Sequence, residues 1–233
     1  GKTQAMTQLT CAGNTAQGIR EQLRNYLRQG IDCVTALRGG ETRMSDGLSD
    51  EAELVKLIRR EFADSFTVAV DGAPEGEPLG SSLEGEITRL KAIQDSGADF
   101  LITRLCWDMD IFRGWLEGIR AAGITLPVMA GVAPVVDQAA TIRTALATGG
   151  CAIPEDLCRL LSDYWIYPNP FVKDPFDAEV ERKRVQFREA GMAYTAHQIW
   201  LYRQWGVDGI HLLTQNRAED VPAIVRAARN SSF

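Results

Sequence analysis

The sequence predicts an α/β fold built on parallel strands, either a (β/α) barrel or a doubly wound sheet. Apolar runs of strand length alternate with helical patterns along the whole chain, which is the order of repeated βαβ units. The apolar runs are continuous rather than alternating, as in strands that are covered on both faces. Several helical patterns end in a glycine that leads directly into the next strand. These three observations together favour a parallel sheet.

The elements follow from apolar periodicity and from the residues that punctuate it. Strands are predicted where short apolar runs lie between polar segments, at 6–11, 32–37, 66–70, 100–105, 126–132 and 209–213. Helices are predicted where apolar residues recur every three or four positions, at 15–29, 49–62, 84–96, 108–122, 136–147, 154–161, 178–205 and 221–228. The predicted stop signals are the glycines at the helix ends, Gly30, Gly97, Gly123 and Gly206.

Length and composition predict one domain over residues 1–233. The chain is 45% hydrophobic and 24% charged, with a net charge of −6. The acidic balance argues against nucleic-acid binding. No apolar stretch reaches the roughly 18 residues of a membrane span, and no signal-peptide pattern opens the chain. The five cysteines, an odd number, are typical of reduced thiols. We therefore expect a cytoplasmic protein without membrane or nucleic-acid partners.

The run from Cys33 to Gly40 is the most informative segment. It is an apolar strand that ends in Arg38, Gly39 and Gly40 and then breaks into a polar loop. Arginine forks onto anionic oxygens, and glycine allows backbone to approach a ligand closely. A structural turn explains the same residues equally well.

Metal and nucleophile chemistry find little support in the sequence. His197 lies in the long helical pattern and His211 in the last strand, and neither has a second His or Cys at zinc spacing. Cys151 and Cys158 are too far apart for a C-x-x-C site, and no G-x-S-x-G, P-loop or G-x-G-x-x-G motif occurs. We expect no metal site, and an enzyme with this sequence would use the chemistry of a cofactor.

Six segments in order resemble the methylenetetrahydrofolate reductase family. They are Gln8-Leu-Thr-Cys11, Gly30-Ile-Asp-Cys-Val-Thr-Ala-Leu-Arg-Gly39, Gly72-Ala-Pro-Glu-Gly-Glu-Pro78, Leu90-Lys with Ser96-Gly-Ala-Asp-Phe-Leu-Ile-Thr103, Ala130-Gly-Val-Ala-Pro-Val135, and Leu213-Thr-Gln-Asn-Arg-Ala-Glu219. Each motif is weak alone, but their common order covers nearly the whole chain.

The resemblance implies a (β/α)₈ TIM barrel with FAD across the carboxyl ends of the strands. It implies that NADH or NADPH reduces the flavin and that the flavin then reduces a folate substrate, giving 5-methyltetrahydrofolate. The positions implied for the cofactor are Thr10, Leu37, Arg38, Gly39, Gly40, Ala69, Ala73 and Glu86. Those implied for the substrate are Arg104, Gln215 and Arg217.

Only about six of the eight barrel strands can be counted, and the first of them resembles the family's third. The family's general acid lies in its opening strands, so no catalytic residue is assigned here. A barrel without two strands would expose two sheet edges and an open core. We expect a leading segment of roughly 70 residues, estimated from about 30–35 residues per βα unit; completion of the fold in another way is the alternative.

The ligand-facing positions depart from the family pattern. Ala73 and Glu77 stand where the family has Tyr and His, Ile93 where it has a Lys, and Arg104 where it has a Gln. Losing a cation and adding an anion should weaken the binding of a dinucleotide diphosphate. Two functions remain open: a divergent reductase that binds FAD weakly, and a non-catalytic or repurposed member that binds a folate-like or anionic ligand.

The aromatic, proline-containing segment 164–176 cannot form a regular helix. Aromatic enrichment suits an interface, so a homo-oligomer contact is one interpretation. Packing of the segment on its own barrel is the other.

Overall fold

The computed structural model describes residues 4–40, 44, 46–76, 82–147, 150–165, 178–214 and 219–230. The chain divides into two compact units. The first contains residues 1–76, 80–103 and 117–128, and the second contains residues 77–79, 104–116 and 129–233.

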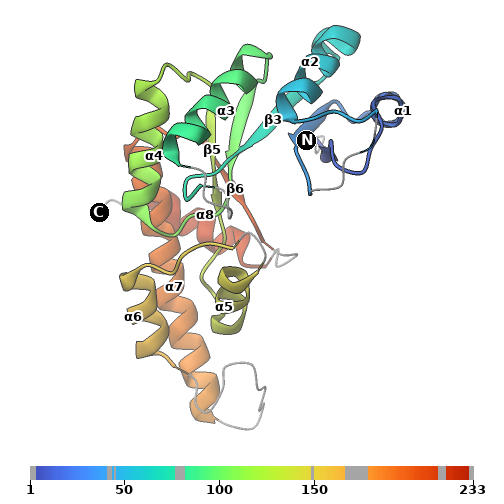
Figure 1. Ribbon diagram of the computed structural model, residues 1–233. Coiled ribbons are helices and arrows are strands. Elements are labelled where there is room, and N and C mark those ends of the chain that lie inside the picture. The colour runs from blue at the N-terminus through green and yellow to red at the C-terminus, as the bar shows by residue number, and fades with distance from the viewer. Residues whose placement is uncertain are drawn as a thin grey trace. The chain divides into compact units, whose positions relative to one another are not determined.

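The first unit is a parallel sheet with a helix after each of its first three strands (Figure 1). Its elements in chain order are β1 (Met6–Thr10), α1 (Ala16–Arg28), β2 (Cys33–Leu37), α2 (Glu51–Phe62), the 3-10 helix η1 (Ala63–Ser65), β3 (Thr67–Gly72), α3 (Leu83–Asp95) and β4 (Phe100–Thr103). The four strands lie in sequence order. The register pairs Met6 with Cys33, Cys33 with Thr67, and Ala69 with Phe100.

Side-chain caps explain why the helices of this unit begin where they do. The Thr15 hydroxyl accepts a hydrogen bond from the Gly18 N–H, and the Ser82 hydroxyl accepts one from the Gly85 N–H. Such caps satisfy N–H groups that have no partner inside the helix. The apolar helix faces then cover the sheet, and the core comprises Leu9, Ile19, Leu23, Val34, Leu54, Ile58, Val68, Val70, Leu90 and Leu101.

The second unit is built around a long helix. Its elements are α4 (Met109–Ala121, whose last turns belong to the first unit), β5 (Val128–Val132), α5 (Gln138–Leu146), α6 (Glu155–Asp163), α7 (Ala178–Gln204), β6 (Gly209–Leu212) and α8 (Val221–Asn230). Strand β5 pairs in parallel with β6, with Met129 opposite Gly209. Helices α6 and α8 both contact α7 (Figure 1).

Helix α7 lies directly against the segment that follows β5. The Val135 N–H donates to the Thr195 hydroxyl at 3.0 Å, and that hydroxyl donates to the Gly191 carbonyl at 2.8 Å. A Cβ at Gly191 would overlap the Val135 carbonyl oxygen. Only glycine therefore allows this approach of helix to backbone.

The predicted strands and helices are confirmed, with ends that differ by a few residues. The four predicted stop glycines all have positive φ, between 74° and 97°. Element η1 was not predicted, and it begins at Ala63, a non-glycine residue with φ 47°. All five cysteines are free, and only Cys158 is exposed. The α/β class with parallel strand pairs is thus established.

Candidate functional site

The carboxyl ends of β1 and β2 are joined by backbone hydrogen bonds. The Cys11 N–H donates to the Leu37 carbonyl and the Ala12 N–H donates to the Arg38 carbonyl, both at 3.0 Å. Gly39 has φ +79°, and a Cβ on it would lie 2.7 Å from the Ala12 Cβ. Gly39 is therefore required where the two strand ends pack together. This contact supports the interpretation of Gly39 as part of a structural turn.

Arg38 and Gly40 remain accessible at the same end. Both are exposed, and a Cβ added to Gly40 would meet nothing within 4 Å. Leu37 and Thr10 are half-buried beside them, and the Thr10 hydroxyl donates to the Ala12 carbonyl at 3.3 Å. The structure thus brings Thr10, Leu37, Arg38, Gly39 and Gly40 together at one edge, with a guanidinium that can meet an anionic ligand.

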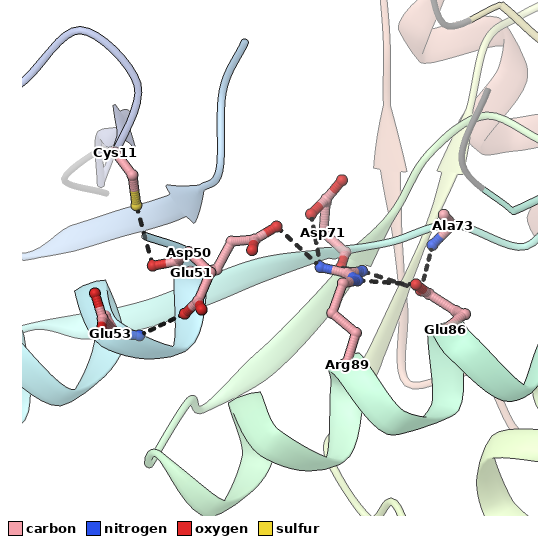
Figure 2. Close-up of polar contacts among 8 residues, drawn as sticks. All are labelled: Cys11, Asp50, Glu51, Glu53, Asp71, Ala73, Glu86 and Arg89. Atoms are coloured by element: carbon pink, nitrogen blue, oxygen red, sulfur yellow. Dashed lines mark hydrogen bonds and ion pairs between the residues drawn. The ribbon is translucent and has the colours of Figure 1, made fainter. Parts of the chain in front are cut away.

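The start of α2 lies against the end of β1 (Figure 2). The Cys11 thiol donates to the Asp50 carbonyl at 3.2 Å. The Asp50 side chain accepts from the Glu53 N–H and so caps α2, and the Glu53 carboxylate accepts from the N–H of Ser49, the residue before the cap. Burial, together with the charge of Glu51, raises the pKa of Cys11 to about 12. Cys11 is therefore a thiol at neutral pH and not a nucleophile.

Arg89 of α3 stands at the centre of a cluster of three carboxylates (Figure 2). Its Nε and Nη2 donate to the two oxygens of Glu86, at 2.9 and 3.0 Å. Its Nη1 contacts Glu51 at 3.1 Å and Asp71 at 3.4 Å, and Nη2 also donates to the Asp71 carbonyl at 2.7 Å. We call Glu51, Asp71, Glu86 and Arg89 the Arg89 cluster. It connects α2, β3 and α3.

The electrostatics of the Arg89 cluster are dominated by burial. Glu51 and Glu86 are 4% and 2% exposed. Burial raises the pKa of Glu51, and the guanidinium of Arg89 opposes that shift. The pKa of Arg89 is also raised, because the hydrogen bonds and charges of its carboxylate partners outweigh its own burial. Three carboxylates face one guanidinium, so the cluster carries excess negative charge even if Glu51 is protonated.

The remaining positions that the resemblance implies for the cofactor are buried and not accessible to a ligand. Ala69 and Ala73 are 0% and 2% exposed, and the Ala73 N–H donates to Oε1 of Glu86 at 2.9 Å. Ile93, where the family has a Lys, is 1% exposed in the core. The accessible edge around Arg38 fits an anionic flavin. The resemblance implies that Glu86 stands where the family has an Asp near the ribose of FAD. The buried positions around Glu86 do not fit that ribose.

In the second unit, Arg104 follows β4 and is half-buried. Asp108, four residues on, caps α4 by accepting from the Asp110 and Ile111 N–H groups at 3.1 and 3.0 Å. Trp107 is 1% exposed, and its indole N–H has no hydrogen-bond partner among the residues that the structure describes. The indole lines a cavity of about 20 Å³ at the ends of β5 and β6, which is room for one water molecule.

Several predicted positions lie outside the described residues. They are Gln215 and Arg217, implied for the substrate, the neighbouring Asn216, the substituted Glu77, and most of the aromatic segment 164–176. Sequence reasoning missed Glu51, Asp71 and Arg89. The signal that could have found them is the Glu86–Arg89 spacing of three on one helix face, together with acidic residues at the end of β3 and the start of α2.

Two classes of site have no support within the described ranges. There, no group of three or more His, Cys, Asp and Glu side chains is arranged to hold a metal ion. None of the helices in the same ranges combines the length and apolar character needed to cross a membrane. His197 instead stacks on Trp200 along α7, with ring centroids 5.7 Å apart.

Parallel strands joined by helices define an α/β protein, a class in which ligands bind at the carboxyl ends of the strands, where Arg38 is exposed in this chain. The sequence model of one family, described as methylenetetrahydrofolate reductase, matches residues 2–229. The chain belongs to the methylenetetrahydrofolate reductase family. The predicted resemblance and the family's α/β class are thereby confirmed.

Relatives from three kingdoms show how much of the family the chain spans. It is 33% identical to methylenetetrahydrofolate reductase 1 of Schizosaccharomyces pombe over 60% of this chain and 24% of the relative. It is 31% identical to methylenetetrahydrofolate reductase (NADH) 1 of Zea mays over 68% of this chain and 29% of the relative. The Escherichia coli 5,10-methylenetetrahydrofolate reductase is 26% identical over 93% of this chain and 67% of its own length. The chain thus spans about a quarter of the length of the fungal and plant relatives.

Proposed function

We infer that this chain belongs to an enzyme that reduces 5,10-methylenetetrahydrofolate to 5-methyltetrahydrofolate with NADH or NADPH. The family match over residues 2–229 carries this proposal. The accessible Arg38 at the carboxyl ends of β1 and β2 supports it, because the reductant and the folate are both anionic. The Zea mays relative is named for NADH, and NADPH stays the alternative.

The reaction transfers one hydride to the methylene carbon and one proton to the nitrogen that leaves it, while the nicotinamide is oxidised. A bound flavin supplies the carrier for that hydride between the two substrates. Arg38 would hold an anionic group of a ligand through its guanidinium. Arg104 has donors and a permanent charge but no acceptor, so it would orient a substrate oxygen and could not accept a proton.

The described residues assign no general acid. Glu51, Asp71 and Glu86 are all engaged by Arg89. The sequence resemblance places the family's acid in strands that precede the first of the matched segments. The acid therefore stays unassigned.

We also propose a cytoplasmic setting, which the thiols support. All five cysteines are free and four are buried, which supports a reducing, cytoplasmic compartment. A homo-oligomer through the aromatic segment 164–176 stays a prediction.

The proposal is tested by supplying the purified chain with methylenetetrahydrofolate, each reduced nicotinamide and flavin under anaerobic conditions. Formation of 5-methyltetrahydrofolate, followed by chromatography, is expected. No product with either nicotinamide, and no folate binding by calorimetry, would overturn the proposal.

A second candidate is a member of the family that binds a folate-like or anionic ligand without catalysis. The closed Arg89 cluster favours it, because Ala73 and Glu86 are withdrawn from any ligand. Folate binding without product formation in the same experiment would select this function.

A further inference from the structure

We propose that the Arg89 cluster makes this chain select a flavin mononucleotide over the flavin adenine dinucleotide. This inference rests on the proposed flavin-dependent function. It concerns the described residues at the ends of β1, β2 and β3 and the starts of α2 and α3. The cluster fills the place that the resemblance gives to the ribose of FAD, and it leaves the edge at Arg38 accessible.

The first argument is that three of about four acceptor positions of the Glu86 carboxylate are already filled by groups of this protein. Its Oε1 accepts from the Ala73 N–H at 2.9 Å and from Nη2 of Arg89 at 3.0 Å. Its Oε2 accepts from Nε of Arg89 at 2.9 Å. The carboxylate is 2% exposed. Because Glu86 is buried, a ribose hydroxyl could reach the remaining acceptor position on Oε2 only by opening the cluster, which would break charge-assisted hydrogen bonds.

The second argument is that Arg89 has no donor left for a phosphate. A guanidinium carries five N–H groups. The Nε group serves Glu86, the two on Nη1 serve Glu51 and Asp71, and the two on Nη2 serve Glu86 and the Asp71 carbonyl. Arg89 therefore binds groups of α2, β3 and α3 with all of its N–H donors.

The third argument is electrostatic. The side chains of Glu51, Asp71 and Glu86 are 5%, 15% and 1% exposed, so their excess negative charge is poorly screened. A dinucleotide that reached toward the ribose position would bring its diphosphate toward this charge. The single phosphate of a mononucleotide can pair with the exposed Arg38 at the end of β2 without entering the cluster.

The test is a titration of the purified chain with FMN, FAD and riboflavin, followed by flavin fluorescence and by calorimetry. We expect FMN to bind on the order of tenfold more tightly than FAD. The variant Glu51→Ala removes the cluster member that has a single contact to Arg89. It should strengthen the binding of FAD and so reduce the difference in affinity between FMN and FAD. Glu51→Gln removes the same negative charge while keeping the size of the side chain and its contact to Arg89, so it should weaken the preference for FMN in the same direction, which guards against a folding defect in the alanine variant.

Glu53→Ala is the matched control, because Glu53 lies in the same helical turn and carries the same charge but is exposed. Equal gains in FAD affinity from Glu51→Ala and Glu53→Ala would assign the effect to long-range charge and overturn the inference. Equal or tighter binding of FAD by the unmodified chain would overturn it while leaving the proposed function standing. Binding of neither FMN nor FAD would overturn both.

Discussion

The backbone N–H of Ala73 donates to Oε1 of Glu86 across 2.9 Å, fastening the loop after β3 to the first turn of α3. Glu86 in turn accepts hydrogen bonds from Nε and Nη2 of the Arg89 guanidinium. A position that the family resemblance implies for a ligand is therefore used inside this protein to position its own backbone. The consequences are measurable in stability, in pH dependence and in ligand binding.

Arg89→Leu should destabilise the protein by about 3–5 kcal/mol, because it leaves buried carboxylates without their counter-charge. Urea unfolding measures the change. Arg159→Leu is the control, since its pair with Glu155 is 68% and 88% exposed, and exposed pairs of this kind contribute at most about 1 kcal/mol. Similar losses from both variants would contradict the central role of Arg89.

Glu51→Gln should stabilise the protein at neutral pH and have little effect in acid. The pKa of Glu51 is raised above its ordinary value of 4.5, mainly by burial. The folded state thus binds this proton more tightly than the unfolded state, and stability is lost as the pH rises from 4.5 through the raised pKa. The gain in the free energy of unfolding from Glu51→Gln should grow as the pH rises through that window and then level off. Unfolding curves at a series of pH values would show it, and a pH-independent difference would rule it out.

Gly191→Ala should destabilise the protein by about 1–3 kcal/mol, the usual range for overpacking, because its Cβ would overlap the Val135 carbonyl. Helix propensity alone predicts the opposite sign, by about 1 kcal/mol in favour of alanine. Gly114→Ala in α4 separates the two effects, since its Cβ would meet nothing within 4 Å. That variant should be stabilised, and thermal unfolding of the pair gives the comparison.

Arg38→Leu should lower the affinity for FMN at least about tenfold while leaving the melting temperature nearly unchanged. The side chain is exposed, and the structural contact of this residue is its carbonyl, which accepts from the Ala12 N–H. Arg28→Leu is the control. Arg28 is the exposed last residue of α1, so its loss removes the same charge but should leave FMN binding intact. A large loss of stability with unchanged binding would assign Arg38 to the fold instead.

Arg104→Gln should raise the rate of methylenetetrahydrofolate reduction severalfold if the substrate pocket has drifted from the family pattern. Glutamine both donates and accepts hydrogen bonds, which suits an amide-like ring edge, whereas arginine only donates. Steady-state kinetics with the two proteins provide the measurement. Loss of an activity that the unmodified protein shows would place Arg104 in the mechanism.

Local patterns predicted the elements well, because capping residues, stop glycines and apolar periodicity act over a few positions. The start of η1 at Ala63 escaped prediction, since no glycine marks its positive φ. The Arg89 cluster escaped for a different reason. Its members come from α2, β3 and α3, and only the pairing of β2 with β3 and the packing of the helices bring them together. The family resemblance identified Glu86 but could not show that Arg89 occupies both of its oxygens.

The reactivity of the thiols can report local opening of each unit of the protein. Cys158 on α6 is exposed, whereas Cys11 and Cys33 are buried in one unit and Cys106 and Cys151 in the other. A thiol reagent should therefore modify one cysteine at once and the remaining four only as fast as each region opens. Peptide mapping of the modified sites over time would yield a separate opening rate for each unit within a single experiment.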